Sequence, residues 1–443
     1  MIAVFLVVVF GVLFGIHFYL WKRLVKDTTT RGRARLLGTL GMVAMVLLIV
    51  SGLTFGRLAR PDAARWIAWP AYLWLATMFY LLVILAVLEI PRLVLRFTWV
   101  RRAQVAEEPV PVEEPALVPA TESAASAPPA GASTAPPTEP STGPPAAGSP
   151  AAGSPAAGSP AAGRPARAAD PGRRLLLARG MAIAAGATSV ATVGYGVSQA
   201  MGGPRLDRVT IPLAKLPRQL DGLRIALVSD IHLGPLLGRS HTRRIVDMIN
   251  GVGADLVAVV GDLVDGSVAE LGPAAEPLAD LESKHGSFFV TGNHEYFSGY
   301  AEWIDEVDSL GLRVLQNERV EIEGLDLAGV NDVTGGSYRH APDFDKALGD
   351  RDPARPVVLL AHQPIQVTEA AKHGVDLQLS GHTHGGQIQP FGALVRLEQP
   401  VVSGLDTVDG TKIYVTNGAG FWGPPVRVGA PPQVSVVELR AIQ

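Results

Sequence analysis

The sequence contains no cysteine at any of its 443 positions. This absence excludes disulfides, thiolate zinc sites, iron–sulfur clusters and cysteine nucleophiles. An excess of charge of one sign is also missing, because 38 lysines and arginines stand against 41 aspartates and glutamates, for a formal net charge of −3. This balance excludes a strongly basic nucleic-acid binder, and the sequence implies no nucleic-acid partner.

Charged residues make up only 18% of the chain, and the mean hydropathy of +0.25 is high for a soluble protein. Three stretches near the start of the chain, 2–20, 36–55 and 66–88, contain no charged residue. Each is close to the roughly 20 residues that a helix needs to cross a bilayer. We therefore expect a transmembrane region with three helices over 1–102, in contact with the lipid bilayer.

The distribution of basic residues predicts how these helices are oriented. The loop after the first stretch carries six lysines and arginines, the segment after the third carries four, and the intervening loop carries three. Loops that are richer in lysine and arginine stay in the cytoplasm. The amino terminus is therefore expected outside the cell and residue 102 inside it.

Two segments of unusual composition follow. The segment 103–172 holds 16 of the 35 prolines and almost no large apolar side chains, so we expect a disordered linker. The segment 173–202 begins with Arg173 and Arg174 and continues into a mildly apolar stretch, which predicts a twin-arginine-like export signal or a fourth transmembrane helix. Either would place the rest of the chain outside. The alternative is a loop or amphipathic segment that leaves it in the cytoplasm.

Beyond residue 202 the pattern changes to short β-branched runs separated by glycine-rich turns and helical stretches, which is typical of an α/β domain over 203–443. Five apolar runs there each end in a cluster of polar residues. These runs are 223–228, 256–260, 287–290, 357–360 and 375–379. Because ligands bind at the carboxyl ends of the strands in open α/β sheets, we expect the five clusters to form one site.

The five clusters offer carboxylate, amide and imidazole groups and no thiolate. Their members are Asp230, His232, Asp262, Asp265, Asn293, His294, His362, His382 and His384. Such donors suit divalent ions such as Mn, Fe or Zn, and they exceed what one ion can take. The sequence therefore predicts two divalent ions, an arrangement that clamps an in-line displacement at phosphorus.

In order and spacing class, the five clusters resemble the motifs of the calcineurin-like metallophosphoesterases. These motifs are DxH at 230–232, GDxxD at 261–265, GNHE at 292–295, the histidine at 362 and GHxH at 381–384. The longer run GHTHGGQ is similar to the membrane-associated or twin-arginine-exported branch of that superfamily. The resemblance covers about 205–443. It implies an α/β catalytic domain with a two-sheet β-sandwich flanked by helices and a dimetal site at the strand ends.

The resemblance also implies a ligand set for each ion. One ion would be held by Asp230, His232 and His384, and the other by Asn293, His362 and His382. Asp262 would bridge the two ions, and a hydroxide bridging them would be the nucleophile.

We also expect roles other than metal binding for three further residues. His294 would contact the phosphoryl oxygen and protonate or stabilise the leaving group, or would only orient Asn293. Asp265 would belong to a turn or orient a histidine. Arg427 would pair with a substrate phosphate, or would be a surface or structural arginine.

We therefore expect a multi-pass metallophosphoesterase of a bacterial-type cell membrane, with its catalytic domain on the extracytoplasmic side. Its substrate would be a phosphorylated small molecule or a lipid-linked molecule of the cell envelope, cleaved at a phosphoester or pyrophosphate bond. One alternative is a hydrolase like the UDP-2,3-diacylglucosamine pyrophosphatase of lipid A synthesis, acting at the cytoplasmic face. Another is a non-catalytic phosphate-binding sensor, which the complete set of candidate ligands disfavours. A channel is also disfavoured, because the apolar stretches carry no charge.

Overall fold

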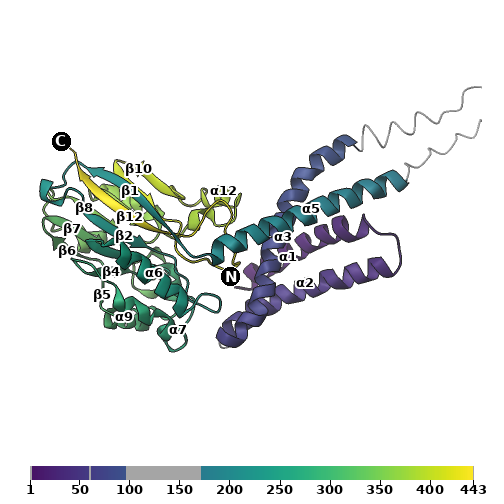
Figure 1. Cartoon of the computed structure of the whole chain (residues 1–443), viewed down its shortest axis with the longest axis horizontal. Coiled ribbons are helices and arrows are strands. Elements are labelled where there is room, and N and C mark those ends of the chain that lie inside the picture. The colour runs from purple at the N-terminus through teal and green to yellow at the C-terminus, as the bar shows by residue number, and fades with distance from the viewer. Residues whose placement is uncertain (1, 59–60, 96–170, 443) are drawn as a thin grey trace, which may run out of the picture. The chain divides into compact units, whose positions relative to one another are not determined.

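The computed structural model describes residues 2–58, 61–95 and 171–442 (Figure 1). The linker expected at 103–172 lies outside these residues, except for its last two positions, which begin a helix.

Four helices in the described residues are long and apolar enough to cross a membrane. They are α1 (Ile2–Leu20), α2 (Arg33–Leu58), α3 (Pro61–Leu95) and α5 (Pro171–Met201), and a short π-helix (Trp21–Lys26) continues α1. The three charge-free stretches lie inside α1, α2 and α3, and α5 contains the twin-arginine-like segment. The prediction of apolar helices able to span a membrane is confirmed.

Polar contacts join three of these helices at one end. Arg23, just after α1, pairs with Glu89 of α3 at 2.8 Å. Arg179 of α5 donates a hydrogen bond from Nε to the carbonyl oxygen of Thr28 at 3.0 Å. Glu89 of α3 and Arg179 of α5 therefore lie beside the segment that follows α1.

The rest of the chain forms two mixed sheets of six strands each. The first sheet has the order β1 (Arg205–Leu213), β12 (Gln433–Ala441), β2 (Arg224–Val228), β3 (Leu256–Val260), β4 (Ser287–Val290) and β5 (Leu312–Val314). Strands β2 to β5 run parallel, and β12 runs antiparallel to β2. In this register Val228 faces Val259 across the β2–β3 pair.

The second sheet has the order β10 (Gly404–Val408), β11 (Thr411–Val415), β9 (Leu377–Ser380), β8 (Val357–Leu360), β7 (Leu325–Gly329) and β6 (Glu318–Ile322). Its four central strands, β11, β9, β8 and β7, run parallel. Both sheets therefore have a group of adjacent strands whose carboxyl ends lie at one edge.

Short helices connect the strands. Those between strands of the first sheet, or leading out of it, are α6 (Arg239–Val252), α7 (Val268–Ala275), α8 (Asn293–Phe297) and α9 (Tyr300–Ser309). Those associated with the second sheet are α10 (Phe344–Leu348), α11 (Val367–Lys372) and α12 (Gly392–Val395). Single 3-10 turns occupy Arg218–Leu220, Glu276–Asp280, Val333–Tyr338, Pro364–Gln366 and His384–Gly386.

Alternation along the strands builds the core. Ile225 and Leu227 of β2 point into the layer between the sheets, where they join side chains of the second sheet such as Leu379. Ala226 and Val228, one position along, point to the opposite face and pack with α6. Helices α10 and α11 cover the outer face of the second sheet. The expected α/β domain, a two-sheet sandwich flanked by helices, is confirmed (Figure 1).

Candidate metal centre

The five polar clusters follow five central strands and meet where the two sheets end. Three follow β2, β3 and β4 of the first sheet, and two follow β8 and β9 of the second. Backbone hydrogen bonds tie the loops together, from Asp230 N–H to the Gly261 carbonyl at 3.0 Å and from Gly381 N–H to the His362 carbonyl at 3.0 Å. Residues far apart in the sequence thus share one edge of the sandwich.

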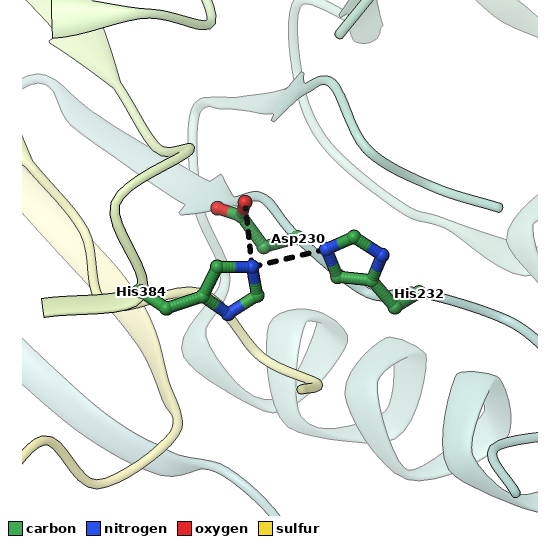
Figure 2. Close-up of side chains that lie close together, drawn as sticks. All are labelled: Asp230, His232 and His384. Atoms are coloured by element: carbon green, nitrogen blue, oxygen red, sulfur yellow. Dashed lines mark hydrogen bonds and ion pairs between the residues drawn. The ribbon is translucent and has the colours of Figure 1, made fainter. Parts of the chain in front are cut away.

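The first donor group consists of Asp230, His232 and His384. One ligand atom from each lies within 4.8 Å of the others. His384 Nε2 is 3.0 Å from His232 Nε2 and 3.4 Å from Asp230 Oδ1. Figure 2 shows the three side chains turned toward one another. Two imidazole nitrogens facing each other beside a carboxylate can hold a divalent ion.

The second donor group consists of Asp262, His362 and His382, whose ligand atoms also lie within 4.8 Å of one another. His362 Nε2 is 3.1 Å from Asp262 Oδ2. The amide oxygen of Asn293 joins this group, because it is 3.0 Å from His382 Nδ1. The structure therefore brings together the second set of residues that the resemblance assigns to one ion.

Asp262 lies between the two groups. Its Oδ2 is 3.8 Å from His232 Nε2 in the first group and 3.1 Å from His362 Nε2 in the second. Its Oδ1 accepts a hydrogen bond from the backbone N–H of His294 at 2.9 Å. Burial alone would raise the pKa of Asp262, but the facing imidazoles, His362 first, hold this pKa well below its usual value. The residue is therefore a carboxylate that both groups can share.

The backbone at the candidate ligands is strained. Among the described residues, ten non-glycine residues have a positive φ, and half of them are candidate ligands. These are Asp230, His232, Asp262, His382 and His384, with φ between 49° and 71°. L-residues adopt this left-handed conformation at a cost, and such strain concentrates at functional sites. The strands end in these turns, which direct consecutive polar side chains into one space.

Two glycines allow the loops to approach closely. A Cβ at Gly292 would lie 2.3 Å from Asp262 Oδ1, and a Cβ at Gly381 would lie 2.3 Å from Asp230 Oδ2. Any side chain at either position would displace a carboxylate. Gly292 therefore lets the loops after β3 and β4 approach each other, and Gly381 lets the loop after β9 of the second sheet approach Asp230 of the first.

The residues present fit divalent metal ions. His362 Nε2 is buried and makes no hydrogen bond within the described residues, although it faces Asp262. Burial and then His362 lower the pKa of His382 to about 3, and burial and then Arg427 hold the pKa of His384 well below its usual value. Burial alone would lower the pKa of His362, but Asp262 raises it well above its usual value, so a metal ion there would displace a proton. Neutral imidazoles are the form that binds metal. The nitrogen and oxygen donors suit Mn, Fe or Zn.

His294 lies beside these groups and does not belong to either. Its Nδ1 is 2.7 Å from Asp265 Oδ1, and the same oxygen is 2.9 Å from His232 Nδ1. Burial alone would lower the pKa of His294, but the hydrogen bond to Asp265 and the charges of Asp262 and Asp265 raise it to about 9. Asp265 thus orients two histidines at once, and it leaves His294 Nε2 free to carry a proton.

Arg427 does not lie at the open side of the site, where a substrate phosphate would have to bind. It is fully buried, and its Nη2 donates to His384 Nδ1 at 3.0 Å. Its Nε donates to the Gly420 carbonyl at 3.1 Å. The guanidinium lies behind the first donor group, where it holds the His384 ring with Nε2 turned toward Asp230 and His232. This placement is that of a structural arginine, not of a substrate ligand.

The sequence reasoning assigned no role to Glu295, which connects two of the clusters. Its buried carboxylate accepts hydrogen bonds from the backbone N–H groups of Asp262, Leu263 and Gly292 at 2.6–3.0 Å. It therefore fixes the end of β3 against the start of α8. A glutamate three residues after the helix N-cap is the available signal, because this position returns a carboxylate to the preceding backbone.

Comparison with known proteins places this centre in a family. Residues 223–386, which include all seven candidate ligands, match the calcineurin-like phosphoesterase family. An uncharacterized metallophosphoesterase of Helicobacter pylori is 41% identical over 256 residues, which are 56% of this chain and 68% of that protein. One of Aquifex aeolicus is 37% identical over 241 residues, which are 53% of this chain and 92% of that protein.

A zebrafish (Danio rerio) protein described as a transmembrane protein with metallophosphoesterase domain is also similar. It is 39% identical over 260 residues, which cover 56% of this chain and 60% of the zebrafish protein. The resemblance seen in the five motifs is confirmed by these matches. On the strength of its fold, its motifs and these relatives, the chain belongs to the calcineurin-like metallophosphoesterase family.

Proposed function

We propose that this protein is a membrane-anchored phosphoesterase that uses two divalent ions to hydrolyse phosphoester or pyrophosphate bonds. The observation that carries the proposal is the position of Asp262, whose Oδ2 faces a histidine nitrogen of each donor group. A carboxylate shared by two N/O donor sets is the arrangement that two-ion hydrolysis requires. Bound ions would supply the positive charge that polarises the phosphoryl group and acidifies a water molecule.

His294 is the acid in this proposal. It lies next to the candidate ligand Asn293, its side chain is partly exposed, and Asp265 orients its Nδ1. Its Nε2 is therefore the atom that would donate a proton to the leaving oxygen. Glu295, which is buried, positions the surrounding backbone and does not contact the substrate.

A substrate in the membrane or cell envelope fits this chain best. The relatives include a protein described as transmembrane, and four described helices are long and apolar enough to span a bilayer. Attachment to the membrane raises the effective concentration of the enzyme toward molecules at the lipid surface.

The experiment on full-length protein in detergent removes metal with a chelator, restores Mn²⁺, and compares bis-p-nitrophenyl phosphate with p-nitrophenyl phosphate. We expect turnover that requires the metal and about two bound ions per chain. Two bound ions without turnover of these or of a panel of natural phosphoesters would favour the phosphate-binding sensor instead. Binding of only one ion would contradict the two-ion proposal.

The catalytic domain is proposed to face the outside of the cell. Glu89 of α3 and Arg179 of α5 lie beside the basic segment that follows α1, and basic segments stay in the cytoplasm. The absence of cysteine permits a direct test in a bacterial host. A cysteine at Glu282 in the catalytic domain should react with a membrane-impermeant maleimide in intact cells, and one at Arg31 should react only after lysis.

The reverse labelling pattern would place the catalytic domain in the cytoplasm. That outcome would favour the alternative substrate class, a nucleotide-linked acylated glucosamine, because such nucleotides are cytoplasmic. It would leave the two-ion chemistry unaffected, since the donor groups do not depend on the side of the membrane.

A further inference from the structure

Two loops beside the metal centre expose large apolar side chains. One follows the 3-10 turn His384–Gly386 and carries Phe391, Leu394 and Leu397, which are 43%, 58% and 83% exposed. The other connects β11 to β12 and carries Trp422, which is 58% exposed. We call these four side chains the apolar rim. Single exposed apolar residues are ordinary, but four on two neighbouring loops form a surface that water does not favour.

Hydrogen bonds join the two loops. The side chain of Gln387 accepts a hydrogen bond from Trp422 N–H at 3.1 Å and donates one to the Trp422 carbonyl at 2.9 Å. Gln387 itself has a φ of 44°. Ile388 pairs with Val428 through an isolated β-bridge. These contacts hold the Trp422 backbone against the loop that carries Gln387.

The same two loops contact the apolar helices. Tyr80 of α3 donates a hydrogen bond to the Gln389 carbonyl at 3.0 Å, and the Phe79 and Phe391 rings lie 6.3 Å apart. Arg427 N–H donates to the carbonyl of Gly196 in α5 at 2.9 Å. Tyr80 lies inside the charge-free stretch 66–88 of α3, so the loop that touches it reaches the apolar part of a candidate membrane span.

The rim also reaches the metal centre. The Trp422 ring centroid is 5.9 Å from that of His294, and the Phe297 ring, also exposed, is 5.7 Å from it. One continuous surface therefore runs from the helix contact, over the rim, to the side chain that we propose as the acid.

We propose that the apolar rim inserts into the lipid bilayer beside α3 and α5, so that the metal centre opens at the level of the lipid head groups. Apolar side chains that lie at a membrane surface bury into the boundary between the head groups and the acyl chains in this way. The proposal deepens the proposed function, because it makes a membrane lipid head group the phosphate within reach. A second copy of the chain is the other possible cover for the rim.

The test uses the full chain in nanodiscs that hold one copy each. Because the chain has no cysteine, Leu397→Cys can carry a single environment-sensitive fluorophore. The matched control is Glu282→Cys, an exposed position before β4 at the opposite end of the strands from the site. We expect lipids with brominated acyl chains to quench the probe at 397 at least about twofold more than the probe at 282.

Equal quenching at the two positions overturns the proposal, because with one copy in each nanodisc it shows that the probe at 397 stays in water. Turnover of bis-p-nitrophenyl phosphate by the same labelled proteins separates this outcome from failure of the proposed function. Metal-dependent turnover with equal quenching rejects insertion of the rim into the bilayer and supports the proposed phosphoesterase activity. Selective quenching at 397, without turnover of bis-p-nitrophenyl phosphate or of the panel of natural phosphoesters, supports the rim as a bilayer contact and rejects the phosphoesterase.

Discussion

Replacing Asp262 by asparagine is expected to remove both metal ions and to lower turnover by a factor on the order of 10³ or more. The amide has nearly the shape of the carboxylate but carries no charge. Asp262 Oδ2 faces His232 Nε2 at 3.8 Å and His362 Nε2 at 3.1 Å, so the change removes the negative charge that both donor groups share. Elemental analysis of the purified variant and a steady-state assay measure the two effects.

The matched control for this variant is Asp376→Asn. Asp376 accepts a hydrogen bond from Val357 N–H at 2.9 Å and contacts Lys215 at 3.3 Å, at the amino ends of strands β8 and β9 and away from the site. The control should keep both ions and its activity. Retention of two ions per chain in Asp262→Asn would contradict the bridging role, even if turnover fell.

Replacing His294 by alanine is expected to leave metal content unchanged and to lower turnover by about 10²-fold or more. His294 Nδ1 contacts Asp265, and His294 belongs to neither of the two donor groups, although it also clusters with His232 and Asp265. Its raised pKa, about 9, keeps Nε2 protonated near neutral pH in the metal-free chain. An alanine therefore removes a proton donor and leaves the ligands in place.

Two measurements on this variant distinguish a proton donor from a residue that only orients Asn293. Metal content by elemental analysis separates the acid from the alternative, a residue that only orients Asn293, because loss of an ion would assign the second role. The activity loss should also be larger for substrates with poorly leaving alcohols than for p-nitrophenolate, which needs little protonation. His373→Ala, just after helix α11 and beside Glu369, is the matched histidine control and should have little effect.

Local patterns in the sequence were enough to predict the strands that hold the site. The apolar runs at 223–228, 256–260 and 357–360 became β2, β3 and β8 to within one residue, because buried strands need continuous apolar side chains. The charge-free stretch 66–88 became part of the longer helix α3, which continues through Pro70 and Pro91. Composition thus located the apolar segment more accurately than the ends of its helix.

Contacts between residues far apart in the sequence were harder to predict. Arg427 lies 43 positions after His384, and only the closure of the loop between β11 and β12 decides that its guanidinium points behind that ring instead of toward a substrate. Glu295 is adjacent to recognised residues, but its three backbone partners come from two clusters that meet only in the folded sheet. Neither arrangement leaves a periodic signal.

The sequence by itself determined the donor chemistry, the family and the presence of apolar helices, because these depend on residue types, short spacings and charge-free length. The resemblance already implied that Asp262 is shared by the two ions and allowed Asp265 to orient a histidine. Tertiary structure alone decided that Asp265 contacts two histidines, that Arg427 lies behind His384, and that the rim meets the helices α3 and α5. These relations arise where strands of two different sheets end at one edge, and no local stretch of the chain encodes the distance between them.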